Sequence, residues 1–513
     1  MEQLRIGWGR EDITMEGPVS IPGQMHIRLS EGVIDPLYAT ALALDGGKGQ
    51  DAVIFCALDL VATRGVMDRT VDYLRKIRPD IPADNIIINV THNHSSLGPN
   101  ESRTHTPDGQ AILPGEQVAE FVKEKAAKAI CTAWDNRRPG GIAYGYGYAV
   151  VAHSRRVCYL DDVSLRKPNE TAPNGHAVMY GATNDPMFSH YEAGADHFLN
   201  AMFTFDSANN LTGIVCNVPC PSQLCEHFHK LTGDFWEDVR QGVRKEFGEK
   251  VYVLPQCAAA GDLSPRTLHY KEAQARRMHL KYDINYNMGD AVYAPELKGV
   301  ATPAGYCSES LIRKAMAERK DIGERILAAL KDIYSWSVKD IQTCLPVKHR
   351  LETVELSRRM ITDEETEWCR ENIEKMRNAI PTDGTPEELN FAQSRFNSIR
   401  GRNTRALERY ATQNEQPTLP MRMHVVRLGE IAFCTERFEL YMDFMHRTQA
   451  RSPFIQTFVM QLAGEEGGNY LATQRGREGK GYSASLFCNM VSPEGGQEIV
   501  ENWLRILNEL NED

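Results

Sequence analysis

Short β-branched runs alternate with amphipathic helical patterns over about the first 300 residues, and this alternation most constrains the fold. Such runs predict buried strands, and their alternation with helices is typical of an α/β domain. The clearest predicted strands are residues 51–60, 85–90, 211–218 and 251–257. Predicted helices span 65–78, with an apolar face of Val66, Val71, Leu74 and Ile77, and 115–135. We therefore expect an α/β fold, a mixed β-sheet core flanked by helices.

The stretch from about 308 to 413 differs from the preceding residues, because it is rich in charged residues and its pattern is that of helices. We expect the whole chain, 1–513, to form one domain that carries this stretch as a helical insertion or lid. After about residue 420 strands return, first as a hairpin that turns at Leu428, Gly429 and Glu430. A final amphipathic helix is expected, with Ser492 as its N-cap.

Composition excludes several classes of protein. The net charge is −11 and the pI is about 5.8, so no basic face for nucleic acid is expected. No apolar run approaches the length of about 20 residues that a membrane span needs, and no signal peptide is recognised. The twelve cysteines lie mostly in apolar runs without a CxxC pair, which favours reduced thiols in a cytoplasmic protein. A homo-oligomer is compatible with this sequence.

Reactive residues follow several predicted strands directly. The segments that follow the strands, called strand exits here, are THNH after residue 90, PCPSQ after 218, GDLSPR after 260, TERFE after 434 and GEEGGNY after 463. Sites of α/β proteins collect where loops leave the carboxyl ends of strands. Five such exits, far apart in the sequence, are expected to converge on one cleft.

His92 and His94 form the first candidate pair. If the chain stays extended through Asn93, both imidazoles lie on one side and bind one divalent ion, or one binds while the other faces a substrate. The alternative is a turn in which each histidine hydrogen-bonds to the backbone. Ser264, held before Pro265, either presents its hydroxyl to a cleft or lies in a turn that Asp262 caps.

These motifs, in this order, resemble the catalytic domain of the neutral/alkaline (non-lysosomal) ceramidase family of zinc-dependent amidases. The similarity runs from RIGWGREDIT to about Ser485 and is weak between about 267 and 415. The resemblance implies one zinc ion per chain and the hydrolysis of an amide by metal-activated water. The family's usual immunoglobulin-like C-terminal domain has no counterpart here, so we expect a changed substrate, a small polar molecule or a lipid-like amide.

The resemblance also implies roles for individual residues. THNHSSLGP makes His92 a zinc ligand and His94 a neighbour of the substrate, and FCTERFE makes Glu436 a zinc ligand. GDLSPR places Ser264 in the active site, and AHSRRVCY supplies Arg155, a better match than Arg156. Two tyrosines twelve positions apart complete the pattern: Tyr470 as a zinc ligand and Tyr482 as a catalytic residue.

One position departs from the family pattern, because Cys220 stands where a second zinc-binding histidine is expected. A cysteine thiolate is a good zinc ligand, so the expected ligand set is His92, Cys220, Glu436 and Tyr470. Two alternatives stay open: His227 or His229 replaces it, or the metal is lost.

The sequence therefore predicts a metal-dependent hydrolase of a carbon–nitrogen bond. Hydrolysis of an ester or lactone would use the same chemistry. A thiol hydrolase with Cys220 as nucleophile and His94 or His227 as base is a different enzyme class. A binding protein that kept the fold without catalysis is the alternative outside enzymes. Asp59 is a candidate partner of a ligand histidine, or a cap at the end of its strand.

Overall fold

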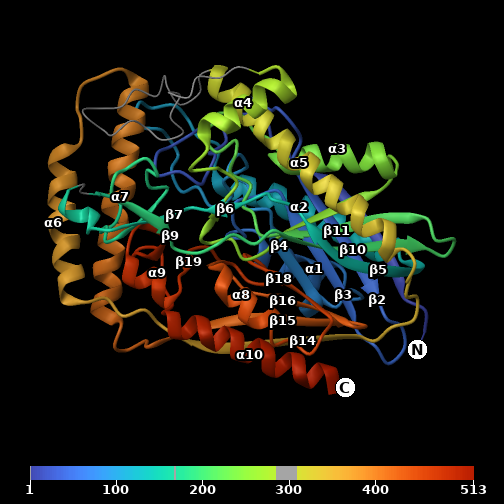
Figure 1. Ribbon diagram of the computed structural model, residues 1–513. Helices are drawn as coiled ribbons and strands as arrows, with labels where there is room; N and C mark the ends of the chain where they lie inside the picture. Colours follow the sequence, from blue (N-terminus) through green and yellow to red (C-terminus); the bar gives the residue numbers. More distant parts are fainter. Residues whose placement is uncertain (1, 167–168, 285–308, 513) are drawn as a thin grey trace.

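Two β-sheets packed face to face form the core of the structure, a computed structural model in which residues 2–166, 169–284 and 309–512 are described (Figure 1). The larger sheet has the strand order β12-β11-β10-β5-β1-β2-β3-β4. Its strands are β1 Arg5–Asp12, β2 Tyr38–Asp45, β3 Ala52–Leu58, β4 Ile86–Val90, β5 Arg138–Tyr148, β10 Phe198–Asp206, β11 Leu211–Val218 and β12 Tyr252–Cys257. The pairs β3–β4 and β11–β12 are parallel and the other neighbours are antiparallel. The expected mixed sheet is thus confirmed.

The smaller sheet has the order β14-β15-β16-β18. Its strands are β14 Val347–Ser357, β15 Thr418–Leu428, β16 Ile431–Thr435 and β18 Gln456–Met460. The predicted hairpin joins β15 to β16, where Leu428 pairs with Ile431. Gly429 lies in this turn with φ +61°, a conformation that glycine adopts without a steric penalty.

The alternation of side chains along β2 shows how the layers are built. Ala39, Ala41 and Ala43 point to one face and pack against the flanking helices. Leu42 and Leu44 point to the opposite face and pack against the smaller sheet. Since successive side chains of a strand alternate between faces, small residues admit the helix while large ones fill the space between the sheets.

Helices cover the outer faces of both sheets. Helices α1 Met67–Ile77 and α2 Gly115–Asp135 lie on the larger sheet, and α10 Pro493–Glu512 lies on the smaller one. The backbone of α2 approaches β1 so closely that a Cβ at Gly7 would lie 2.0 Å from a carbonyl oxygen of the helix. The predicted Ser492 cap is confirmed, because its hydroxyl accepts a hydrogen bond from the amide of Gly495. The predicted apolar face of α1 fails at one position, since Ile77 is exposed.

The stretch expected to be a helical insertion divides into parts with different neighbours. Helix α5 Glu309–Ser337 packs against helix α3 Phe235–Phe247 and strand β5, and strand β14 follows it in the smaller sheet. The pair α6 Asp363–Ala379 and α7 Pro386–Thr412 stands at one side of the molecule (Figure 1). Threonines at 362 and 385 cap these two helices with complete capping boxes.

Short elements complete the fold around the ends of the main strands. They are β6 His153–Ser154, β7 Arg156–Tyr159, β8 Ala177–Met179, β9 Phe188–Tyr191, β13 Leu263–Ser264, β17 Glu439–Leu440, β19 Tyr470–Leu471, α4 Lys271–Tyr282, α8 Met442–Gln449 and α9 Gln474–Gly479. Eleven cysteines in the described ranges are free thiols, nine of them buried, as the sequence led us to expect. Among the helices that the structure describes, none has both the length and the apolar character to cross a membrane.

Candidate active site

A cleft of about 750 Å³ opens where the loops after β4, β11, β16 and β18 meet. Four of the five predicted strand exits thus converge, whereas GDLSPR, the exit after β12, contributes no residue to the lining that the structure describes. The chemically capable side chains in the lining include His92, His94, Gln223, Glu226, Glu439, Tyr470 and Tyr482.

The backbone of His92 is left-handed, with φ +55°, so of the two alternatives for this pair the chain does not take the extended one. In a residue other than glycine this conformation costs about 1–2 kcal/mol, and such backbone strain is concentrated at functional sites. The two imidazoles nevertheless meet, because Nε2 of His92 lies 3.2 Å from Nε2 of His94. Nδ1 of His92 lies 2.8 Å from the carbonyl oxygen of Val61, which can only accept, so Nδ1 carries a proton.

His94 is held by two side chains from the loop after β11. Its Nε2 lies 2.8 Å from the amide nitrogen of Gln223, which donates to it, and its Nδ1 faces Glu226 at 3.6 Å. Burial, together with the neighbouring His92, lowers the pKa of His94 to about 3. The His94 imidazole is therefore neutral near neutral pH and can accept a proton or a hydrogen bond.

Glu439, rather than the expected Glu436, is the carboxylate beside His92. Its Oε2 lies 3.3 Å from Nε2 of His92 and 3.4 Å from Nη2 of Arg155. Burial disfavours the charged form, but His92 and Arg155 outweigh it and lower the pKa of Glu439 to about 2. Glu436 instead turns away from the cleft, and its Oε2 accepts a hydrogen bond from the amide of Phe438. Burial raises the pKa of Glu436 well above its usual value.

A two-residue strand pairing brings the tyrosines to the carboxylate. Strand β17 runs parallel to β19 with Glu439 opposite Tyr470, and the Tyr470 hydroxyl hydrogen-bonds to Glu439. The Tyr470 and Tyr482 rings meet edge to face with their centroids 6.1 Å apart. Burial raises the pKa of Tyr482 to about 12, so its hydroxyl remains a hydrogen-bond donor. The spacing of twelve residues thus puts both tyrosines in the same cleft.

Arg155 lies directly behind the lining, and it is fully buried. Its guanidinium donates to the carbonyl of Gly261 at 2.8 Å and to the hydroxyl of Tyr180 at 3.2 Å, besides its ion pair with Glu439. The alternative, Arg156, is engaged elsewhere in a bidentate ion pair with Glu192. The geometry thus favours Arg155 as the arginine of the site.

Cys220 and Ser264 lie outside the cleft lining that the structure describes. The thiol of Cys220 donates to the carbonyl of Val151 at 3.4 Å, and burial raises its pKa well above the usual value. Ser264 is buried, and its hydroxyl accepts from the amide of Arg266 at 3.3 Å. Of the two alternative histidines, His227 lines the cleft, whereas His229 is not in the described lining and pairs with Glu31.

Two acceptor atoms lie close to Nε2 of His92, Glu439 Oε2 at 3.3 Å and His94 Nε2 at 3.2 Å. When the proton of the His92 ring is on Nδ1, its Nε2 directs a lone pair toward these two atoms. Acceptors that face one another in this way repel unless a proton or a cation lies between them. Ligand atoms about 2.0–2.1 Å from a tetrahedral zinc ion are about 3.3 Å apart, which matches these separations.

The residues that could hold a metal ion here are fewer than the four ligands that were expected. In the described ranges no group of three or more His, Cys, Asp and Glu residues is arranged to hold a metal ion. Tyr470, opposite Glu439 in the β17–β19 pair, could be the third donor to a cation between His92 and Glu439. The expected Cys220 and Glu436 lie outside the described cleft lining, where each side chain hydrogen-bonds to the backbone. Asp59 is not the partner of His92 either, since it forms a buried ion pair with Arg240.

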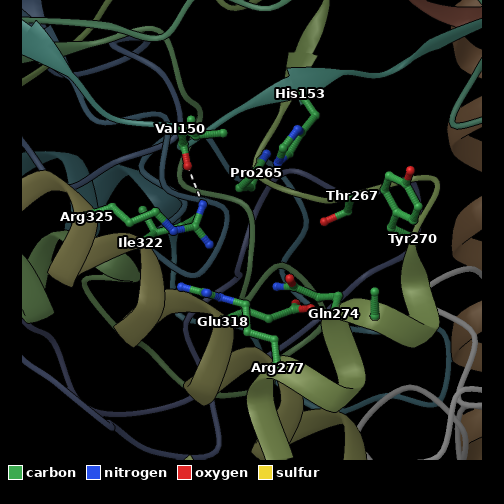
Figure 2. A pocket seen from close by; sticks show the side chains of 11 residues that line it. Val150, His153, Pro265, Thr267, Tyr270, Gln274, Arg277, Glu318, Ile322 and Arg325 are labelled. Atoms are coloured by element: carbon green, nitrogen blue, oxygen red, sulfur yellow. Dashed lines mark hydrogen bonds between the residues drawn. The ribbon is translucent and has the colours of Figure 1, made fainter. Parts of the chain in front are cut away.

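A second pocket, of about 530 Å³, lies beside the β6–β13 pair (Figure 2). Its lining includes His153, Tyr270, Arg277 and Arg325. Both arginines are already paired with the buried Asp321, Arg277 at 2.9 Å. None of the residues that the sequence singled out lines this pocket, so the chemistry is concentrated in the cleft around His92.

Four contributors to the cleft were missed by sequence reasoning: Gln223, Glu226, Tyr180 and Glu439. Glu439 stands three residues after the glutamate that was predicted, and both follow β16 closely. Only the pairing of β17 with β19 distinguishes them, and a two-residue strand leaves no periodic signal in the sequence.

Comparisons with known proteins bear on the fold. The sequence matches no protein-family model and, by sequence alone, no curated protein. The structure is similar to that of the neutral ceramidase from Pseudomonas aeruginosa, with a TM-score of 0.65 and 16% identity, over 99% of this chain and 75% of that one. A ceramidase complexed with C2 is also similar, with a TM-score of 0.62 and 14% identity over the same shares of the two chains. The predicted resemblance therefore holds at the level of structure, and the chain has the neutral ceramidase fold.

Proposed function

We propose that this protein is a zinc-dependent hydrolase that cleaves an amide bond with activated water. The observation that carries the proposal is the set of facing acceptors, His92 Nε2, His94 Nε2 and Glu439 Oε2, in a large cleft. His92, Glu439 and Tyr470 would hold the ion, one per chain, and fewer than four protein ligands leaves a position open. A zinc ion in such a site acts as a Lewis acid and makes water nucleophilic near neutral pH.

The surrounding residues supply the rest of the chemistry. His94 is neutral and would orient the substrate or the attacking water, and Gln223 and Glu226 fix the orientation of its ring. Arg155 and the protonated Tyr482 offer positive charge and a hydrogen-bond donor to the carbonyl oxygen as negative charge develops on it. Ser264 would act indirectly. Its hydroxyl contacts the backbone of Arg266, whose side chain pairs with Glu226 in the cleft lining.

The fold of the two ceramidases supports an amide as the substrate bond. A thiol hydrolase is disfavoured, since the Cys220 thiol is buried, protonated and outside the cleft lining. A small polar amide remains our first proposal for the substrate, with a lipid-like amide as the alternative, and a cytoplasmic location remains a prediction.

The test combines metal analysis with activity. Purified protein is assayed for zinc and for hydrolysis of N-acyl amines beside esters of matched structure. We expect close to one zinc per chain, loss of hydrolysis on chelation, and no loss on treatment with iodoacetamide. His92→Ala should lose both zinc and activity, whereas His105→Ala, at an exposed histidine, should keep both. Full amide hydrolysis by metal-free protein would contradict the proposal, and faster turnover of the esters would make it an esterase.

A further inference from the structure

One face of helix α7 forms part of the wall of the cleft. Seven residues of the helix line the cleft, and five of them recur at intervals of four, three, four and three along a single stripe. These five are Phe391, Arg395, Ser398, Arg402 and Arg405, and the other two are Asn397 and Gly401. Three of the seven are arginines, so α7 brings positive charge into the site.

The carboxylates in the same lining are already neutralised by other cations. Glu439 pairs with Arg155, and Glu226 pairs with Arg266. Both pairs are buried, and Arg266 adds a hydrogen bond to the carbonyl of Gln223 at 2.7 Å. The two carboxylates of the lining are thus paired with Arg155 and Arg266 and not with Arg402 or Arg405.

The hydrogen-bond partners of Arg402 are neutral. Its Nη1 donates to the Tyr482 hydroxyl at 3.1 Å, and its Nη2 donates to Sγ of Cys488 at 2.9 Å. Its guanidinium lies 4.9 Å from the centroid of the Tyr482 ring. A cation is thus fixed directly beside a residue of the candidate active site.

Arg405, one turn further along the helix, is exposed toward the cleft. Its Nη1 lies over Gly401, where a Cβ would be only 3.3 Å away, so the glycine leaves room for the guanidinium. No carboxylate partner of Arg405 is found among the described residues. Burial, then Arg437 and, less strongly, Arg405 lower the pKa of a nearby arginine, Arg64, whereas Glu466 raises it.

The arginines of α7 that line the cleft form a positive wall, in contrast to the net charge of −11 of the whole chain. Guanidinium groups present a planar fork of donors that matches the oxygens of a carboxylate or a phosphate. A neutral lipid amide has no group that needs such a wall. The arrangement instead suits a substrate that brings its own negative charge.

We propose that the substrate of this protein carries an anionic oxyacid group, a carboxylate or a phosphate, which Arg402 and Arg405 hold beside the scissile amide. That the bound group belongs to a substrate rests on the proposed hydrolase function. Binding of the anion does not, because it can be measured without turnover. The contact of Arg402 with Tyr482 places the anionic group close to the bond that is cleaved.

Isothermal titration calorimetry tests the anion site with matched pairs of amides. N-acylglycine is compared with N-acylglycinamide, and phosphorylated N-acylethanolamine with N-acylethanolamine, each with acetyl and octanoyl chains. The proteins are wild type, Arg405→Gln, Arg402→Gln and a control, Arg400→Gln. Arg400 lies on the same helix and undergoes the same change of charge, but it is not part of the cleft lining.

We expect one anionic amide to bind at least about 10-fold more tightly than its neutral partner, since hydrogen bonds to charged groups are the stronger ones. Arg405→Gln should remove most of that preference, Arg402→Gln should weaken it, and Arg400→Gln should keep it. Whether the carboxylate or the phosphate pair shows the preference identifies the group. Equal binding of anionic and neutral partners, or an equal loss in Arg400→Gln, overturns the proposal, as does preference for a short-chain ceramide.

Turnover of the same compounds separates this inference from the proposed function. Anion-selective binding without cleavage of any amide would support the anion site and contradict the proposed hydrolase function. Cleavage of neutral and anionic amides at equal kcat/KM, with equal affinity, would support the hydrolase function and contradict the anion site.

Discussion

The assignment of Glu439 rather than Glu436 to the site can be tested by replacing each glutamate with glutamine. In Glu439→Gln the anionic partner of His92 and Arg155 is lost, so zinc content should fall well below one per chain. The buried Arg155 keeps its hydrogen bonds to Gly261 and Tyr180. We therefore expect a loss in the free energy of unfolding of about 3 kcal/mol, the lower end for a broken buried ion pair.

Glu436→Gln is the matched control, with the opposite expectation. Its Oε2 accepts from the Phe438 amide, a role that the glutamine oxygen can keep. Because burial raises the pKa of Glu436 in the folded state, its contribution to stability is present below the unfolded pKa of about 4.5 and is lost as the pH rises. Glu436→Gln should therefore retain zinc and be more stable than wild type at pH 8, with a difference that shrinks toward pH 4.5.

The measurements are zinc per chain by mass spectrometry and urea unfolding of protein treated with chelator. Because the protein is unfolded without metal, the change in its free energy of unfolding reports the lost ion pair and not the lost zinc ligand. The reasoning is refuted if Glu436→Gln loses its zinc while Glu439→Gln keeps it, or if both variants unfold at the same urea concentration at pH 8.

Three further predictions concern the scaffold. Burial lowers the pKa of His349 to about 4 and that of His424, whose ring it contacts at 2.9 Å, to about 3. The unfolded chain binds more protons below about pH 6.5, so wild type should lose about 2 kcal/mol for each of these histidines on going to pH 5, and His349→Gln should lose less. Asp59→Asn, at a buried pair with two contacts of 2.8 Å to Arg240, should cost about 3 kcal/mol in urea unfolding, and an unchanged midpoint would count against that pair. Gly261→Ala would put a Cβ 2.2 Å from a carbonyl oxygen of β17, so amide turnover should fall while the far-ultraviolet circular dichroism stays native; full turnover would contradict that close contact.

The cleft shows why some site residues could be predicted and others could not. His92 and His94 are found from a motif that follows a buried strand, whereas Tyr470 and Tyr482 are found from the resemblance to the ceramidase family, and the structure brings all four together. The position of the histidines follows from a strand whose apolar run is plain in the sequence. The expected Cys220 fails to reach the cleft because its thiol donates to a backbone carbonyl. A hydrogen bond of this kind depends on a loop conformation that no sequence pattern encodes.

The sequence by itself determined the mixed sheet, the hairpin at Gly429 and the ends of the strands from which the site is built, because burial imposes a period of two on side chains. Only the tertiary structure decided which glutamate faces His92, since that choice depends on a parallel pairing between residues 439 and 470. It also decided that the charged face of α7 lines the cleft instead of facing solvent. Both outcomes rest on contacts between segments far apart in the chain, and such contacts leave no local periodicity to read.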